Sequence, residues 1–139
     1  MVVRSNEESE RVEQEAAAIV SSKWGVSLIK MPKFSGVDYF FYNGVDRRMG
    51  VFEVKRRYND STKYPTVYLS VRKYLALKGY YDEGLLAFFL PYFDDALMYI
   101  GFYDIDASKQ NMLGRRDRSA APNDIEPMIE VPVSSLRTF

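Results

Sequence analysis

The sequence of 139 residues contains no cysteine and no histidine. Without cysteine it can form no disulfides, thiolate zinc sites or thiol nucleophiles. Without histidine it has no imidazole metal ligands, histidine general bases or serine–histidine triads. Any catalysis must therefore rely on carboxylates, lysine, tyrosine, serine or threonine, together with a hard cation such as Mg²⁺.

An excess of positive charge is also missing, because 19 Lys and Arg residues balance 19 Asp and Glu residues. Contacts with phosphate would therefore have to come from local basic patches. No apolar stretch reaches the roughly 20 residues that span a bilayer, and the first residues lack the apolar run of a signal peptide. We expect a soluble, cytoplasmic protein, with residues 1–139 forming one domain around an ordinary hydrophobic core.

Hydrophobic patterns and turn signals predict a helix, three strands, a second helix and further strands. The first helix is expected over residues 5–24, with Ser5 as its N-cap, and the second from Ser70 to about Tyr80. Strands are expected at 26–31, 38–42, 48–57, 85–91, 96–103 and 128–133, and polar loops at 57–66 and 107–125. This order predicts an α/β fold with a mixed sheet.

Three charged residues come together where the second and third strands would form a hairpin. Glu53 and Lys55 are two positions apart, so they share one face of a strand. If the hairpin turns near residues 45–46, Asp38 lies directly opposite Glu53, with Cβ atoms about 5 Å apart. Two carboxylates so close repel each other unless a cation lies between them, which favours a Mg²⁺ site. The alternative is an exposed Asp beside a solvated Glu–Lys pair.

Residues 10–78 resemble the core of the PD-(D/E)xK nuclease superfamily, which includes restriction endonucleases, archaeal Holliday-junction resolvases, VRR-NUC domains and small phage nucleases. Asp38 matches the family Asp, and Glu53 and Lys55 match the (D/E)-x-K pair. Val37 stands where a proline often precedes the Asp. The resemblance implies a restriction-endonuclease-like α/β core, a mixed central sheet flanked by helices in αβββαβ order.

The first helix contains Glu13-Gln14-Glu15-Ala16-Ala17, which resembles the "E-x-x-A-A" helix of resolvase-like members. That helix contributes a Glu near the metal. The family register favours Glu13, and helical geometry leaves Glu15 as an alternative. The resemblance thus implies Mg²⁺ or Mn²⁺ held by Asp38, Glu53 and Glu13. It also implies that Lys55 positions or helps deprotonate a water molecule and stabilises developing negative charge.

Basic residues cluster around the same segment. Ser70 and Lys73 match the "S-x-x-K" that opens the next helix in small phage members, and a helix N-terminus would favour phosphate. Tyr58, Tyr64 and Tyr68 either stack on unpaired bases or pack against the protein. The candidate nucleic-acid-binding residues are Arg56, Arg57, Lys63, Ser70, Arg72 and Lys73, with a weaker second patch at Arg115, Arg116 and Arg118.

These features predict a metal-dependent endonuclease or exonuclease that acts on nucleic acid, with DNA favoured, in the processing, recombination or repair of phage or mobile-element DNA. A phage-encoded protein would work in the cytoplasm of a bacterial host. Symmetric cutting of a junction would require a homodimer, for which the sequence carries no signal. Two alternatives are an inactive nuclease fold that serves as a nucleic-acid-binding or assembly module, and a protein–protein adaptor that uses the aromatic segment 88–103.

Overall fold

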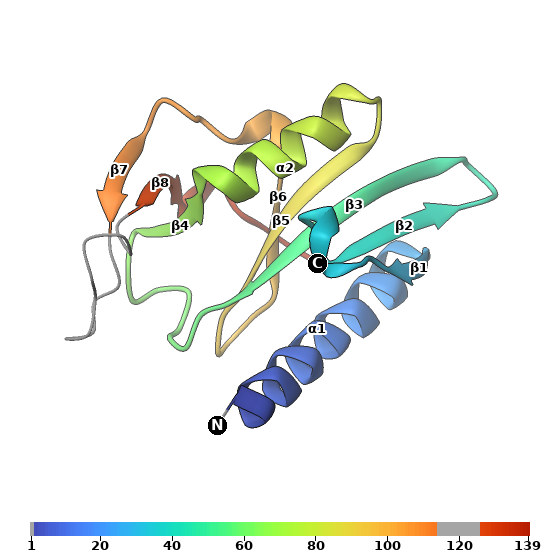
Figure 1. Ribbon diagram of the computed structural model, residues 1–139, viewed down its shortest axis with the longest axis horizontal. Coiled ribbons are helices and arrows are strands. Elements are labelled where there is room, and N and C mark those ends of the chain that lie inside the picture. The colour runs from blue at the N-terminus through green and yellow to red at the C-terminus, as the bar shows by residue number, and fades with distance from the viewer. Residues whose placement is uncertain (1, 114–125) are drawn as a thin grey trace.

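A six-stranded mixed sheet forms the centre of the molecule (Figure 1). The computed structural model describes residues 2–113 and 126–139, with side chains described for 7–111 and 126–139. The strand order is β1-β2-β3-β5-β6-β9; β3 and β5 are parallel, and the other neighbours are antiparallel. The strands are β1 (Ser27–Lys30), β2 (Tyr39–Asn43), β3 (Arg48–Arg56), β5 (Leu86–Tyr92), β6 (Met98–Gly101) and β9 (Arg137–Thr138).

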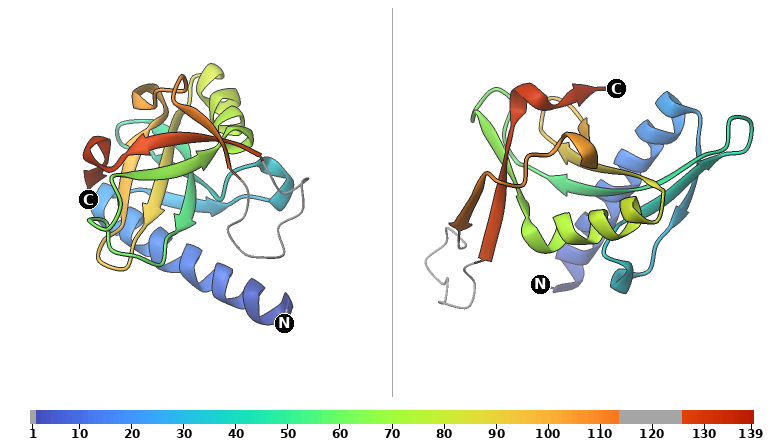
Figure 2. Two further views of the ribbon diagram at one scale, coloured as in Figure 1. Left: turned by 90° about the vertical axis from the view of Figure 1, so that its left-hand side faces the viewer. Right: turned by 90° about the horizontal axis from the view of Figure 1, so that it is seen from above.

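Two helices cover opposite faces of this sheet (Figure 2). In α1 (Val2–Trp24), apolar residues at helical spacing, including Ala16 and Val20, pack against Phe52 and Val54 of β3. On the other face, Leu77 of α2 (Val71–Asp82) packs in a cluster with Val51 and Phe89. Because successive strand residues point to opposite faces, β3 contributes to both cores.

A second, three-stranded antiparallel sheet lies beside α2. It has the order β4-β8-β7, formed by β4 (Thr66–Ser70), β8 (Glu126–Pro132) and β7 (Gln110–Leu113). Its apolar side chains join the core on the α2 side of the large sheet. Short 3₁₀ helices are formed by Lys33–Ser35, Phe102–Asp104 and Val133–Ser135. The small sheet therefore extends the layer that α2 places over β3.

The mixed α/β fold is the one expected from the sequence, but several boundaries differ. Ser5 is not the N-cap of α1, because the helix already begins at Val2. Residues 67–69, left unassigned between the expected loop 57–66 and the second helix, belong to β4 (Thr66–Ser70), and the expected loop 107–125 contains β7. Both strands are completed by pairing with β8, which local patterns do not reveal. Arg115, Arg116 and Arg118 lie outside the described residues.

The expected strand at 96–103 is shorter, because the chain turns into a 3₁₀ helix after Gly101. A search of the described residues finds no helix that is both long and apolar enough to cross a membrane.

Candidate active site

The carboxylates of Asp38 and Glu53 meet at the start of the β2–β3 hairpin. Tyr39 pairs with Phe52 in the ladder, and the backbone N–H of Asp38 donates to the carbonyl of Phe52 over 3.0 Å. Continuing this register by one residue places Asp38 opposite Glu53, as the hairpin in the sequence suggested. The backbone N–H of Val54 donates to Oδ2 of Asp38 over 2.7 Å, which fixes this carboxylate against β3.

The segment before Asp38 is held against α2. Gly36 has φ +83°, and a Cβ atom at this position would lie 2.8 Å from Cβ of Ala76. A side chain there would therefore push the segment away from the helix. The hydroxyl of Tyr80 also donates to the carbonyl of Ser35 over 2.9 Å. The close contact with α2 thus sets where Asp38 enters the sheet.

Both carboxylates have raised pKa values. Burial raises the pKa of Glu53 to about 8, and the nearby charge of Asp38 adds to the effect. Burial likewise raises the pKa of Asp38 to about 6, opposed by its hydrogen bond from Val54. Only 7% of Glu53 is exposed, although a buried carboxylate is costly unless it is paired. The two residues therefore form a desolvated acidic pair that favours a bound cation.

Lys73 provides positive charge beside this acidic pair. It lies in the first turn of α2, where the backbone N–H of Lys73 donates to the capping hydroxyl of Ser70 over 3.1 Å. Its Nζ atom lies 3.4 Å from Oε1 of Glu53, and its charge also lowers the pKa of Asp38. Ser70 thus caps the start of α2, and Lys73 in the first turn of that helix brings its ammonium group to Glu53.

Lys55 lies two residues beyond Glu53 and lines the same groove, of about 120 Å³. Partial desolvation lowers the pKa of Lys55, and the positive charge of Arg57 lowers it further. Arg57 itself is half-buried and donates to the carbonyl of Tyr68 over 2.6 Å. Neither Lys55 nor Arg57 forms an ion pair with another residue that the structure describes. Ser70, Arg72 and Lys73 also line this groove.

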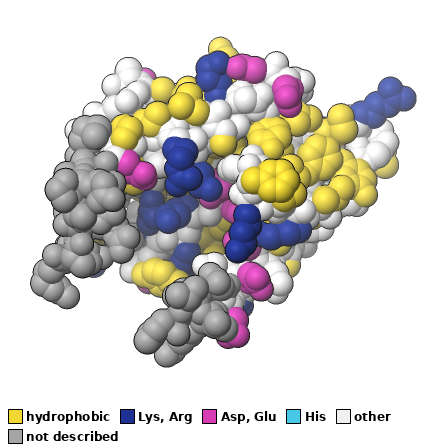
Figure 3. All heavy atoms as spheres, in the orientation of Figure 1, with side chains coloured by type: hydrophobic (Ala, Val, Ile, Leu, Met, Phe, Trp, Pro, Cys, Tyr) yellow, Lys and Arg dark blue, Asp and Glu magenta, His cyan; other side chains and the backbone are white. Residues whose placement is uncertain are grey.

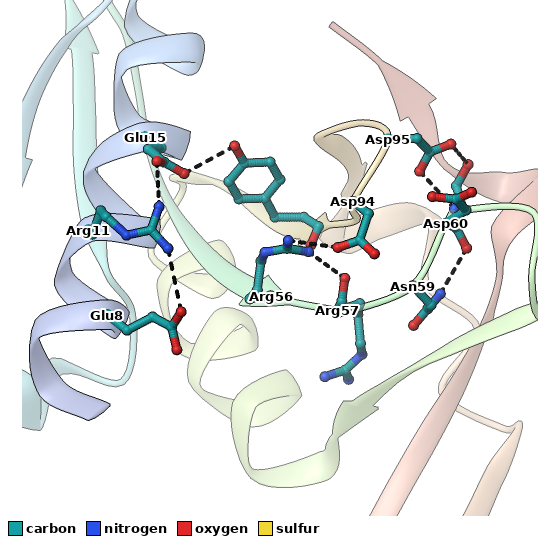
Figure 4. A network of polar contacts seen from close by, with 11 residues as sticks. Glu8, Arg11, Glu15, Arg56, Arg57, Asn59, Asp60, Asp94 and Asp95 are labelled. Atoms are coloured by element: carbon teal, nitrogen blue, oxygen red, sulfur yellow. Dashed lines mark hydrogen bonds and ion pairs between the residues drawn. The ribbon is translucent and has the colours of Figure 1, made fainter. Parts of the chain in front are cut away.

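The structure separates the two candidate glutamates of α1. Glu13 lines a hollow of about 260 Å³ together with Lys30, Asp38 and Lys73, and it is paired with Lys30. Glu15 instead accepts hydrogen bonds from Arg11, over 2.7 Å, and from the hydroxyl of Tyr92, over 3.3 Å (Figure 4). Glu13 is therefore the helix carboxylate that lies on the Asp38 side.

The described residues contain no group of three acidic side chains close enough to hold a metal ion as they stand. The pairing of Glu13 with Lys30 agrees with this, because it joins the carboxylate to a cation already present. Asp38 and Glu53 are thus the two carboxylates best placed to share a cation, and Glu13 lines the hollow beside Asp38.

The remaining basic candidates, Arg56 and Lys63, lie outside the groove of Glu53. Arg56 donates to Asp94 over 2.7 Å (Figure 4). Its guanidinium also lies over the rings of Tyr58 and Tyr92. Lys63 lies in the loop after β3, with Nζ 5.5 Å from the centre of the Tyr64 ring. Neither residue lines the groove of Glu53, whereas Arg57, Ser70, Arg72 and Lys73 do.

Two charged residues near the site have no counterpart among the sequence candidates. Lys30 of β1 pairs with Glu13, and Glu126 of β8 lines the groove beside Lys55. The pairing of β1 with β2 places Lys30 opposite Tyr39, but only the tertiary fold brings Glu126 close to Lys55. On the surface seen in Figure 3, basic side chains gather across the middle of the face, with acidic side chains between them.

Two comparisons with known proteins give matches. A family model described as "Phage putative PDDEXK endonuclease" matches residues 4–139. The structure of Hjc, a Holliday junction resolvase from the archaeal hyperthermophile Archaeoglobus fulgidus, superposes with a TM-score of 0.60 and 17% identity, covering 92% of this chain and 86% of that chain. A comparison with curated proteins finds no match. At this identity the likeness to Hjc concerns the fold, which is resolvase-like. Because the family model spans nearly the whole sequence, the chain belongs to the phage PDDEXK endonuclease family.

Proposed function

We propose that this protein is a divalent-metal-dependent nuclease that hydrolyses phosphodiester bonds in DNA. The observation that carries the proposal is the opposed, desolvated pair Asp38 and Glu53. Glu53 lines a groove together with Lys55, and Asp38 lines the adjoining hollow of Glu13. Membership of a nuclease family supports the same chemistry. Perturbed carboxylates beside a lysine in a groove are typical of catalytic sites.

The residues present fit a hard divalent cation. Carboxylate oxygens are suitable ligands for Mg²⁺ or Mn²⁺, and Mg²⁺ needs only one or two carboxylates besides water and phosphate oxygens. Asp38 and Glu53 would hold the cation, and Glu13 would join them by exchanging Lys30 for it. A bound cation would polarise the phosphate and make a water molecule more acidic.

The protein's own side chains would then complete the site. Lys55 would orient the attacking water and offset the negative charge that develops on the phosphate, since its ammonium group lies two residues from Glu53 on the same strand face. Its lowered pKa also favours transfer of a proton. Arg72, Lys73 and the N-terminus of α2 would bind the neighbouring phosphates, because the N-cap Ser70 sets the helix start at the groove.

The family and the neighbouring structure support a role in the processing, recombination or repair of phage DNA. We propose that residues 1–139 act as a single nuclease domain in the cytoplasm of the bacterial host. If the substrate is a symmetric junction, cleavage of both strands requires a homodimer. Arg56 and Lys63 would contact the substrate outside the groove, because Arg56 is paired with Asp94 and Lys63 lies over the ring of Tyr64.

Cleavage assays with a matched pair of lysine variants test this function. Purified protein is incubated with single-stranded, double-stranded and branched DNA, and with RNA, in Mg²⁺, Mn²⁺ or EDTA. Lys55→Ala should lower the cleavage rate roughly 10²–10³-fold. Lys78→Ala should leave it unchanged, because Lys78 is exposed and pairs with Asp82 over 2.7 Å.

Two outcomes would contradict different parts of the proposal. If no substrate is cleaved and calorimetry detects no binding of Mg²⁺ or Mn²⁺, the protein is an inactive member of the fold. If metal-dependent cleavage survives in Lys55→Ala, the nuclease stands and the assignment of Lys55 is wrong.

A further inference from the structure

A larger cavity, of about 700 Å³, adjoins the groove of Glu53. It lies between the loop that follows β3 and the small sheet, and its volume is in the range of small-ligand pockets. Its walls combine aromatic rings with a few polar groups, contributed by Arg57, Asn59, Tyr64, Tyr68, Phe93 and Glu130. None of the proposed metal ligands lines it, so the catalytic chemistry leaves this cavity unexplained.

The cavity and the groove share two wall residues, Arg57 and Tyr68. Arg57 follows Glu53 by four residues in extended chain, which corresponds to about 13 Å along the strand direction. If one phosphate of a nucleic-acid strand lies at Glu53 and the strand follows the groove toward Arg57, a nucleotide only a few positions away reaches the mouth of the cavity. The two hollows form one continuous surface.

The loop that forms one wall is held in place before any ligand binds. The backbone N–H and the hydroxyl of Ser61 donate to the carboxylate of Asp95 over 2.8 and 2.7 Å. The backbone N–H of Asp94 donates to the carbonyl of Asn59 over 3.0 Å, and Arg56 is paired with Asp94 (Figure 4). A preformed wall lowers the cost of ordering on binding.

The chemistry of the walls suits a nucleobase. Tyr64 is 54% exposed, so its ring is available for stacking, and Phe93 provides a buried apolar surface. Glu130 and Asn59 add polar atoms to the walls, and such atoms are hydrogen-bond partners for the edge of a base. Arg57 supplies positive charge at the shared mouth, where a phosphate would lie.

We propose that this cavity receives an unpaired base of the nucleic acid whose backbone occupies the groove of Glu53. The inference rests on the proposed nuclease function and narrows its substrate class to DNA with single-stranded or branch-point nucleotides. A fully paired duplex keeps its bases stacked, and removing one from the stack costs a few kcal/mol. The cavity therefore favours strands in which a base is already free.

Binding measurements with two tyrosine variants test the cavity directly. Affinities for a short single strand and for a fully paired duplex are measured by fluorescence anisotropy in Ca²⁺, together with 2-aminopurine fluorescence in the single strand. Tyr64→Ala should weaken binding of the single strand roughly 5- to 100-fold and relieve the stacking-induced quenching. Tyr103→Ala is the matched control, because Tyr103 is 81% exposed and does not line the cavity.

The outcomes separate the cavity from the nuclease function. Equal losses for the single strand and the duplex, or no loss in Tyr64→Ala, would overturn the cavity proposal. If the wild type cleaves only paired DNA with no preference for free bases, the cavity proposal also fails while the nuclease stands. If the wild type cleaves nothing and Tyr64→Ala still selectively weakens single-strand binding, the cavity is supported and the catalytic proposal fails.

Discussion

The two faces of β3 differ sharply, although their residues alternate along one strand. On the α1 side, Phe52 is fully buried and Val54 nearly so, among apolar side chains of the helix. On the α2 side, Val51 is buried in the same way, but Glu53 and Lys55 follow it toward the groove. The face toward α1 stabilises the fold. The face toward α2 buries the carboxylate of Glu53, which lowers the stability of the folded protein when that carboxylate is ionised. Such a conflict between stability and local chemistry is expected at functional sites.

The largest expected difference between the two faces is in activity. Glu53→Gln keeps the shape of the side chain but removes the charge that would hold the cation, so cleavage should fall about 10³-fold or more. The folded protein should remain at least as stable, because Gln cannot acquire the buried charge that destabilises the folded state when Glu53 ionises. Cleavage rates and thermal unfolding of the same sample check both parts. If Glu53→Gln loses activity only because it unfolds, the proposed difference between the two faces of β3 is wrong.

On the opposite face the expected effect is on stability. Phe52→Ala should lower the free energy of unfolding by about 3–5 kcal/mol, because it leaves a cavity among Tyr39, Phe41 and the residues of α1. Urea-induced unfolding measures this loss. The cleavage rate per folded molecule should change far less than in Glu53→Gln, and an equally large loss would mean that the two faces are not separable.

The contrast between these faces could largely be predicted from the sequence. Alternation assigns Phe52 and Val54 to one face and Glu53 and Lys55 to the other. A hairpin that turns near residues 45–46 places Asp38 opposite Glu53, and the structure has its four-residue loop there, at residues 44–47. These are local rules, and the short loop leaves the hairpin little freedom.

The groove itself could not be predicted in the same way. β4 pairs with β8, about 60 residues later, and this pairing brings Glu126 to Lys55. The alternation of Val67 and Leu69 with polar neighbours was a strand signal, but it does not identify the partner strand. The contact between Lys73 and Glu53 depends equally on how α2 packs across β3.

The acidic pair also predicts how stability depends on pH without metal. Glu53 has a pKa of about 8, above its ordinary value of 4.5, and Asp38 one of about 6, above 3.8. The folded protein therefore binds these protons more tightly than the unfolded chain, and the resulting stability is lost as pH rises from about 4 to about 8. Unfolding of the wild type and Glu53→Gln between pH 5 and pH 8.5 isolates the contribution of Glu53 together with its coupling to Asp38, since groups away from this pair titrate alike in both.

At pH 8.5 the Gln variant should be more stable than the wild type by roughly 1–3 kcal/mol, and the difference should shrink toward pH 5. Added Mg²⁺ should stabilise the wild type and not the variant, because only the wild type gains a ligand that prefers the folded state. If the free energy of unfolding changes with pH in the same way in both proteins, burial does not raise the pKa of Glu53 and this prediction is wrong.

The smallest expected effect separates the two glutamates of α1. Glu13 lies beside Asp38 and is paired with Lys30, whereas Glu15 is held by Arg11 and Tyr92. Glu13→Gln should weaken Mn²⁺ binding by about 10-fold, as expected for a carboxylate that supports a metal without being its main ligand. Glu15→Gln removes an equal charge from the same helix and should leave binding unchanged. Titration calorimetry of both variants measures this. Equal losses would mean that only the overall charge of α1 matters, and a loss confined to Glu15→Gln would require the helix to turn when the cation binds.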